Sequence, residues 1–152
     1  MRTLPLSAFP LLHELGSDER SALEAELETI ELGDGDVLFR EGEEAAGLVL
    51  VAAGRLRTES SRAGELGEVG PGSALGALSL LCVGRREVTA TAEGKGRVLV
   101  LRRSAFRRFV DDAPRAACRL AEAIAAELAG LVRAQLDPIV AATTVDPTPD
   151  AE

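Results

Sequence analysis

The sequence has no tryptophan, no tyrosine and only 4 phenylalanines among its 152 residues. Single-stranded nucleic acids stack on aromatic side chains, so a binding groove of that kind is disfavoured. Positive charge is also scarce, because 17 basic residues are outnumbered by 25 acidic ones and the formal net charge is −8. Since a phosphate backbone needs a concentrated basic face, we predict no direct binding to nucleic acid.

Histidine and cysteine are nearly absent as well. The sole histidine, His13, would leave a cupin-type metal barrel without its ligands and a serine or cysteine hydrolase without its base. The two cysteines, Cys82 and Cys118, have no metal-ligand spacing, so we predict small buried residues in a reducing compartment, the cytoplasm. No metal, no cofactor and no enzymatic activity are expected.

Long apolar runs are missing too. Residues 1–10 lack the apolar stretch of a signal peptide. The most apolar region, 113–132, is interrupted by Arg115, Arg119, Glu122 and Glu127. We therefore expect neither a secretory leader nor a membrane span.

Glycine is concentrated in the middle of the chain, where 13 of the 15 copies lie from Gly33 to Gly96. Glycine supplies the positive φ of tight turns, so this region is predicted to form short strands joined by turns. The predicted strands cover residues 29–32, 36–40, 47–52, 55–60, 65–69, 87–92 and 97–102. Since hardly any helix-length segment separates them, an antiparallel roll is favoured over a parallel α/β sheet.

The flanks are predicted to be helical. Before the strands, Ser17 is a candidate N-cap for a helix over 17–28, which follows a weaker helix near 4–12. After them, Ser104 is a candidate cap for a short helix to residue 110.

A longer helix is predicted from Pro114 to about Leu136, because proline suits the first turn of a helix. A heptad-like seam, apolar except at its last position, recurs at steps of four and three: Ala117, Ala121, Ile124, Leu128, Leu131 and Gln135. Such a seam packs either on its own β-roll or on a second copy of the chain. Residues 137–152 are rich in proline and acids, which predicts a flexible tail. The predicted domain spans 1–136, with N-terminal helices at 1–28, a β-roll at 29–102 and C-terminal helices at 104–136.

Two stretches of the middle region carry an ordered set of turns. Residues 33–58 read GDGDVLFREGEEAAGLVLVAAGRLRT, with Gly35, Gly42 and Gly54 at the turns, and residues 70–106 read GPGSALGALSLLCVGRREVTATAEGKGRVLVLRRSAF. Together they resemble the cyclic-nucleotide-binding domain family of catabolite activator proteins and of protein kinase A regulatory subunits. The resemblance covers roughly residues 6–136. It implies a mainly β fold, a double-stranded β-helix or jelly-roll-like barrel with short N-terminal helices and a long C-terminal helix.

The second stretch is similar to the family's phosphate-binding cassette. There, backbone N–H groups at the start of a short helix and one arginine bind the phosphate, and a glutamate binds the ribose. Gly76 matches the start of the cassette, and Arg86 matches its arginine. The resemblance implies that Gly76, Leu78 and Ser79 supply backbone donors and that the ligand is cyclic AMP or cyclic GMP. The predicted ligand-binding residues are Gly76, Ala77, Leu78, Ser79, Arg86, Glu87 and Val88.

Three positions depart from the family's cassette. Ala77 stands at the position of the ribose-binding glutamate, Arg85 at that of a proline, and Glu87 at that of a small residue. A carboxylate beside an anion and a ribose hydroxyl without an acceptor both lower affinity. A shift of the alignment by one residue would make Arg85 the phosphate ligand instead.

Two functions remain open at this point. One is a regulatory sensor that binds a cyclic nucleotide or another small anion weakly or not at all, and that shifts the helices at 104–110 and 114–136. The other is a ligand-free, degenerate domain that acts as a dimerisation or protein-interaction scaffold. A homodimer through the 114–136 helix would place Ala121 and Ile124 near the cavity mouth. Relatives that switch genes carry a helix-turn-helix after this helix, and the 16 residues after Leu136 are too few for one.

Overall fold

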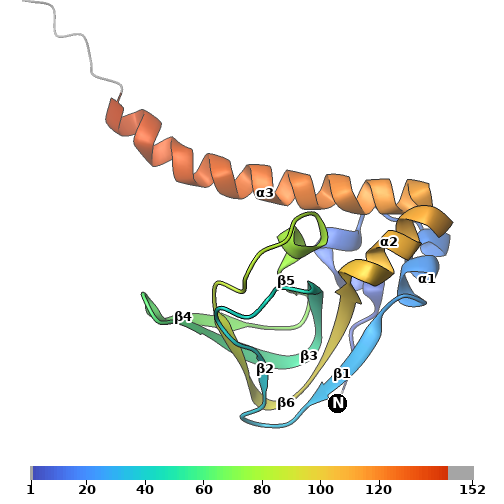
Figure 1. Ribbon diagram of the computed structural model, residues 1–152, viewed down its shortest axis with the longest axis horizontal. Coiled ribbons are helices and arrows are strands. Elements are labelled where there is room, and N and C mark those ends of the chain that lie inside the picture. The colour runs from blue at the N-terminus through green and yellow to red at the C-terminus, as the bar shows by residue number, and fades with distance from the viewer. Residues whose placement is uncertain (1, 144–152) are drawn as a thin grey trace, which may run out of the picture.

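Antiparallel strands form the middle of the protein, and helices pack along one side of them (Figure 1). The computed structural model describes residues 2–143. The strands are β1 (Glu28–Leu32), β2 (Val37–Phe39), β3 (Gly47–Ser60), β4 (Gly64–Val69), β5 (Ala74–Leu75) and β6 (Thr89–Arg102). β6 pairs with β1, β2 and β3, and β3 also pairs with β4 and β5. The predicted mainly β roll with flanking helices is confirmed.

The two long strands, β3 and β6, each join two strands that the sequence predicts separately. They stay paired through register shifts near Ala53, where the sheet bends without ending. Gly54 lies at this bend with φ +82°, and a Cβ there would lie 2.5 Å from the carbonyl oxygen of Lys95. Glycine is thus needed at residue 54 for the close approach of the two strands. The two-residue strand β5 was not predicted.

Strand β3 is apolar on both faces because both faces are covered. Leu48 and Leu50 pack in a cluster shared with the helices. Val49 and Val51, which alternate with them, face the interior of the roll. The run of consecutive apolar residues in β3 therefore serves two separate cores, one on each side of the sheet.

The helices lie at the two ends of the described chain, apart from one 3₁₀ turn between β5 and β6. They are the 3₁₀ turns η1 (Leu6–Ala8) and η2 (Pro10–Leu12), helix α1 (Ser17–Glu24), the 3₁₀ turn η3 (Ala77–Leu80), and helices α2 (Arg103–Asp112) and α3 (Pro114–Thr143). Helix α3 runs along the η3 side of the roll and continues past it (Figure 1). Leu120 and Ile124 in the first half of α3 are fully buried, whereas every residue from 129 to 142 is exposed.

The start of α3 at Pro114 is as predicted, but its end is not. The helix continues to Thr143 and contains Pro138, whereas the sequence predicts an end at about Leu136. A proline removes only its own backbone hydrogen bond, and an exposed helix has room for the distortion its ring causes. The other residues of the predicted tail, 144–152, lie outside the described residues.

Both predicted serine caps are wrong. The N-cap of α1 is Gly16, whose backbone N–H donates to the carboxylate of Glu19 at 2.9 Å, and Ser17 is already helical. The helix ends before residue 28 because Glu28 begins β1. Ser104 lies inside α2, since β6 leads into that helix directly.

The prediction that both cysteines are buried is also wrong. Cys82 and Cys118 are free and exposed. Cys82 follows η3, and Cys118 lies one turn before Glu122 on the outer side of α3. Their places in the fold, at a loop and on an outward helix face, override the usual preference of cysteine for the core. Within residues 2–143, no helix combines the length and the apolar character that crossing a membrane requires.

Candidate functional site

A cavity of about 450 Å³ lies between η3, the open end of the roll and α3. It is lined by all of the predicted ligand-binding residues: Gly76, Ala77, Leu78, Ser79, Arg86, Glu87 and Val88. The fold therefore brings these residues together around one space. Whether they bind a ligand stays a prediction.

The guanidinium of Arg86 is half-buried at this cavity. Its Nη2 donates to the carbonyl oxygen of Gly47 at 3.0 Å, and its Cζ lies 4.3 Å from the ring centroid of Phe39. Burial lowers the pKa of Arg86, and the carboxylate of Glu43 opposes that shift. An arginine nonetheless stays protonated in proteins, so the cavity contains a positive charge that is partly removed from water.

The backbone on both sides fixes the position of this charge. The N–H of Arg86 donates to the carbonyl of Glu43 at 2.7 Å, and the N–H of Gly42 donates back to the carbonyl of Arg86 at 2.8 Å. On the other side, Gly76 has φ +71°, and a Cβ there would collide with Nη1 of Arg86. Glycine at 76 is therefore required both by the backbone angle and by the guanidinium beside it.

Ser79 is used within the fold. Its hydroxyl lies 2.6 Å from the carbonyl oxygen of Gly47 and 2.5 Å from that of Gly76. The hydroxyl therefore donates to the protein's own backbone. Its backbone N–H also donates to the Gly76 carbonyl, at 3.0 Å. The backbone donor expected from Ser79 is thus already engaged, and Ser79 fixes the shape of the cavity wall.

The positions that depart from the family's cassette lie at the edge of the cavity. Arg85 is exposed, and its Nη1 donates to the carbonyl oxygen of Gly42 at 2.8 Å. Glu87 is exposed as well, and Ala77 is half-buried without a polar side chain. Of the two arginines, Arg86 is the one whose guanidinium is half-buried and stacked against Phe39.

Several residues of the cavity wall lie outside the predicted set of ligand-binding residues, although Arg85 among them is the predicted alternative to Arg86. They are Phe39, Ala45, Ala74, Leu75, Cys82, Gly84, Arg85, Ile124, Glu127, Leu128 and Leu131. The heptad-like seam of the long helix contains three of the lining residues on α3, and Ile124, expected near the cavity mouth in a dimer, does line the cavity. Ala121, which was expected near the cavity mouth in a dimer, is not among the lining residues.

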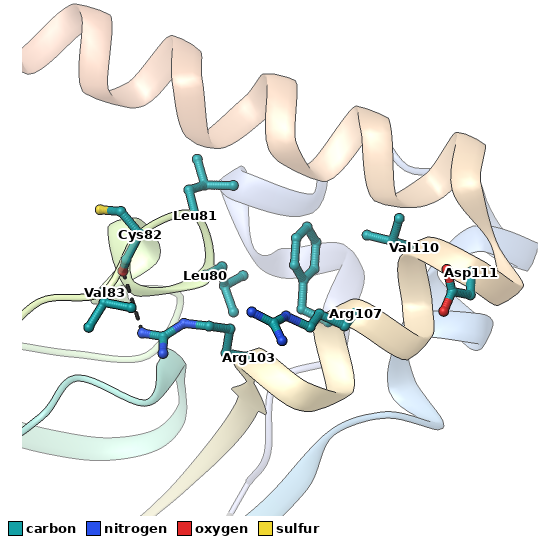
Figure 2. Close-up of a pocket in the computed structure, with 9 residues that line it drawn as sticks. Leu80, Leu81, Cys82, Val83, Arg103, Arg107, Val110 and Asp111 are labelled. Carbon is teal, nitrogen blue, oxygen red and sulfur yellow. Dashed lines mark hydrogen bonds between the residues drawn. The ribbon is translucent and has the colours of Figure 1, made fainter.

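Arg103 connects η3 to the first turn of α2. Its Nε donates to the carbonyl oxygen of Ser79 at 2.9 Å, and its Nη2 donates to that of Ala45 at 2.9 Å and that of Cys82 at 3.4 Å. Figure 2 shows the last of these bonds beside a second cavity of about 520 Å³ between η3 and α2. The sequence predicts neither the role of Arg103 nor this cavity, because the contacts join segments far apart in the chain.

Arg103→Ala is expected to lower the free energy of unfolding by about 1–3 kcal/mol, because carbonyl groups at Ala45, Ser79 and Cys82 lose their donor. Urea denaturation followed by circular dichroism would measure the loss. The matched control is Arg107→Ala, one turn further along α2 and exposed, for which a change within about 0.5 kcal/mol is expected. Equal effects of the two substitutions would contradict the role given to Arg103.

No cluster of three or more histidine, cysteine, aspartate or glutamate side chains placed to hold a metal ion occurs in residues 2–143. The charge available in the cavity is thus that of its arginines and carboxylates, and the half-buried one is positive.

Comparisons with known proteins agree with the fold. Residues 29–113 match the family model of the cyclic nucleotide-binding domain. The N-terminal domain of a transcriptional regulator from Streptomyces coelicolor A3(2) is 29% identical, with a TM-score of 0.74 over 80% of this chain and 90% of that one. The catabolite activator protein of Thermus thermophilus is 28% identical, with a TM-score of 0.74 over 88% of this chain and 63% of that one.

Two further matches are more distant or more partial. The structure of cAMP-bound PfPKA-R (141–441) is 22% identical, with a TM-score of 0.68 over 94% of this chain and 46% of that one, which shows a shared fold. Lysophospholipase nte1 of Neurospora crassa is 30% identical over 110 residues, which make up 70% of this chain. The chain spans only 7% of the length of that curated relative.

Proposed function

The chain belongs to the cyclic nucleotide-binding domain family, and on that basis we propose that it is a regulatory sensor module, not an enzyme, which binds a small anion between η3 and α3. The observation that carries the proposal is the half-buried guanidinium of Arg86 beside the left-handed Gly76, with the cavity in front of both.

An anion is the ligand that this arrangement favours electrostatically. Removing a guanidinium from water costs free energy unless an opposite charge compensates it. Arg86 has one side-chain hydrogen bond among the described residues, to the Gly47 carbonyl, so its other N–H donors can bind a ligand. Cyclic AMP and cyclic GMP are the candidates that family membership suggests.

We expect cyclic nucleotides to bind weakly or not at all. Ala77 offers no acceptor for a ribose hydroxyl, and Glu87 places a carboxylate at the edge of the cavity. A buried unpaired hydroxyl costs about 1–3 kcal/mol. Since each 1.4 kcal/mol corresponds to about a tenfold change in affinity, these two positions could move a micromolar site into the millimolar range.

Occupancy would be transmitted through contacts on both sides of η3. Leu128 and Leu131 of α3 line the cavity opposite η3, so a ligand would contact the helix directly. Arg103 links the carbonyl of Ser79 to the start of α2. A ligand that binds one placement of η3 more tightly than another would therefore bias the placement of α2 and α3.

Isothermal titration calorimetry with cyclic AMP and cyclic GMP tests the proposal on the wild type and on Arg86→Ala. We expect at most weak, millimolar affinity in the wild type and no detectable binding in the variant, because the charge-assisted hydrogen bonds to the anion are lost. The matched control is Arg62→Ala, an exposed arginine between β3 and β4 that does not line the cavity, and its loss should leave affinity within about threefold, below 1 kcal/mol. Binding that survives in Arg86→Ala would contradict the assigned site.

A second function, a dimerisation or protein-interaction scaffold, is favoured by the exposed half of α3. Its large exposed apolar residues follow each other at steps of one, three and four: Leu131, Val132, Leu136, Ile139 and Val140. A stripe of this kind packs well against a second copy of the same helix. We therefore propose a homodimer through α3, and a reducing cytoplasm suits the free thiols of Cys82 and Cys118.

Sedimentation velocity tests the dimer. The wild type is expected to sediment as a dimer and Leu136→Lys as a monomer, because a charge would be buried in the seam. The control is Ala134→Lys, an exposed position on the other side of the helix, which should remain dimeric. A monomeric wild type at micromolar concentration would exclude the homodimer, and no binding of any anion with an intact dimer would favour the scaffold over the sensor.

A further inference from the structure

The residues that line the cavity limit the chemical class of ligand that can bind in it. On the roll side they include Leu75 and Val88, both half-buried. On the helix side they include Ile124, which is fully buried, together with Leu128 and Leu131. Apart from Arg86, the surfaces that a ligand would contact on both sides are therefore mainly hydrocarbon.

The polar groups around this wall are either engaged or at the rim. The hydroxyl of Ser79 lies within hydrogen-bonding distance of the carbonyl oxygens of Gly47 on β3 and of Gly76 beside η3 and donates to these backbone acceptors. Glu87 and Glu127 are exposed, so their carboxylates lie where water reaches them. Arg85 is exposed as well and donates to the carbonyl oxygen of Gly42, so Arg86 is the half-buried charged side chain among the described lining residues that can meet a ligand inside the cavity.

This distribution disfavours a ligand with several hydroxyl groups. Hydroxyls placed against Leu75, Val88 or Ile124 would lose their hydrogen bonds to water and gain none. It also disfavours a second negative charge, because the carboxylates of Glu87 and Glu127 border the cavity. A ligand with one anionic group on a hydrocarbon chain avoids both the loss of hydroxyl hydrogen bonds and the repulsion of a second negative charge.

The orientation of the guanidinium suits a planar anion. The ring of Phe39 lies over Arg86, and Nη2 is bonded to Gly47. The free N–H groups therefore point from the edge of the guanidinium plane, which is the geometry that binds a carboxylate through two oxygens. A volume of about 450 Å³ falls in the range of cavities that hold small organic ligands.

We propose that the cavity binds an organic monocarboxylate with an apolar body, its carboxylate against Arg86 and its hydrocarbon between Leu75, Val88 and α3. The inference rests on the proposed function, since it names the ligand class of the same site. It differs from cyclic-nucleotide recognition in requiring no ribose acceptor.

Calorimetry of the full chain with four probes tests this ligand class. The probes are octanoate, octanamide, acetate and cyclic AMP. Octanoate is expected to bind. Octanamide keeps the hydrocarbon but not the charge, and acetate keeps the charge but not the hydrocarbon, so each should bind at least tenfold more weakly than octanoate. Cyclic AMP should also bind more weakly than octanoate.

Two pairs of variants locate the bound octanoate. Arg86→Gln should reduce its affinity at least tenfold, and Arg62→Gln, at an exposed arginine that does not line the cavity, should leave it unchanged. Leu131→Asn should reduce it about threefold or more because Leu131 lines the cavity. Val132→Asn is the control, since Val132 is similarly exposed, at 54% against 59%, and is not a lining residue. Thermal melts of all four variants confirm that they are folded.

The outcomes separate this inference from the proposed function. Cyclic AMP binding more tightly than octanoate, and lost in Arg86→Gln, would overturn the monocarboxylate class and leave the anion sensor intact. Equal binding of octanoate and octanamide, or octanoate binding that survives in Arg86→Gln, would overturn the inference as well. An absence of binding by every probe would overturn both.

Discussion

Gly47→Ala is expected to lower the free energy of unfolding by about 3 kcal/mol, a large share of the stability of a domain of this size. Gly47 lies at the start of β3 opposite Arg102 of β6. A Cβ there would collide with the carbonyl oxygen of Leu101 and lie 2.9 Å from the Cα of Arg102. Both neighbours are backbone atoms of the longest strand pair in the fold, so neither can move without opening the sheet.

The effect would reach the cavity, because the carbonyl of Gly47 accepts hydrogen bonds from Arg86 and Ser79. Urea denaturation followed by circular dichroism measures the change in stability. The matched control is Gly70→Ala, where a Cβ has no neighbour within 4 Å and φ is not positive. That substitution should be neutral or stabilise by about 0.5 kcal/mol through the unfolded chain. A Gly47→Ala protein as stable as the control would show that β3 and β6 approach less closely than described.

Gly76→Ala is expected to abolish anion binding while leaving most molecules folded. The left-handed φ of +71° costs alanine about 1 kcal/mol, and the Cβ would collide with Nη1 of Arg86. Since the end of an arginine side chain is flexible, the guanidinium should move out of its place instead of the backbone. We expect a loss of affinity of at least tenfold, similar to that of Arg86→Ala.

Gly94→Ala separates backbone strain from the collision. Gly94 has φ +74°, nearly that of Gly76, and a Cβ there has no neighbour within 4 Å. The two variants should therefore lose similar stability in thermal melts, about 1 kcal/mol, while only Gly76→Ala loses affinity in calorimetry. Full affinity in Gly76→Ala would mean that Arg86 does not need to lie against residue 76 to bind the anion.

The sequence predicts the β-roll well because its signals are local. Glycine residues at turns and runs of apolar residues between them depend on neighbours in the chain, and the structure contains both. The pairing of Gly76 with Arg86 follows from a spacing that the family shares. At Gly54 the sequence predicts the end of one strand, whereas the structure has a bend within β3. The sequence shows the glycine but not its close approach to β6.

The remaining features of the site depend on contacts between distant segments. Phe39 covers the guanidinium of Arg86 from β2, and no periodic pattern connects those two positions. Arg103 donates to carbonyl groups, which every residue possesses, so no residue type marks its partners. The exposure of Cys82 has the same cause, since its place at the end of η3 decides its burial.

The central claim is that the Arg86 guanidinium binds an anion in the cavity at η3. Two-dimensional ¹H–¹⁵N spectra of arginine side chains test it at the atom concerned, with Arg86→Gln used to assign the Arg86 Nε signal. Titration with octanoate, cyclic AMP or cyclic GMP should move that signal saturably for at least one of them and leave in place the Nε signal of Arg62, which does not line the cavity. An Arg86 signal that none of the three anions moves would contradict the account.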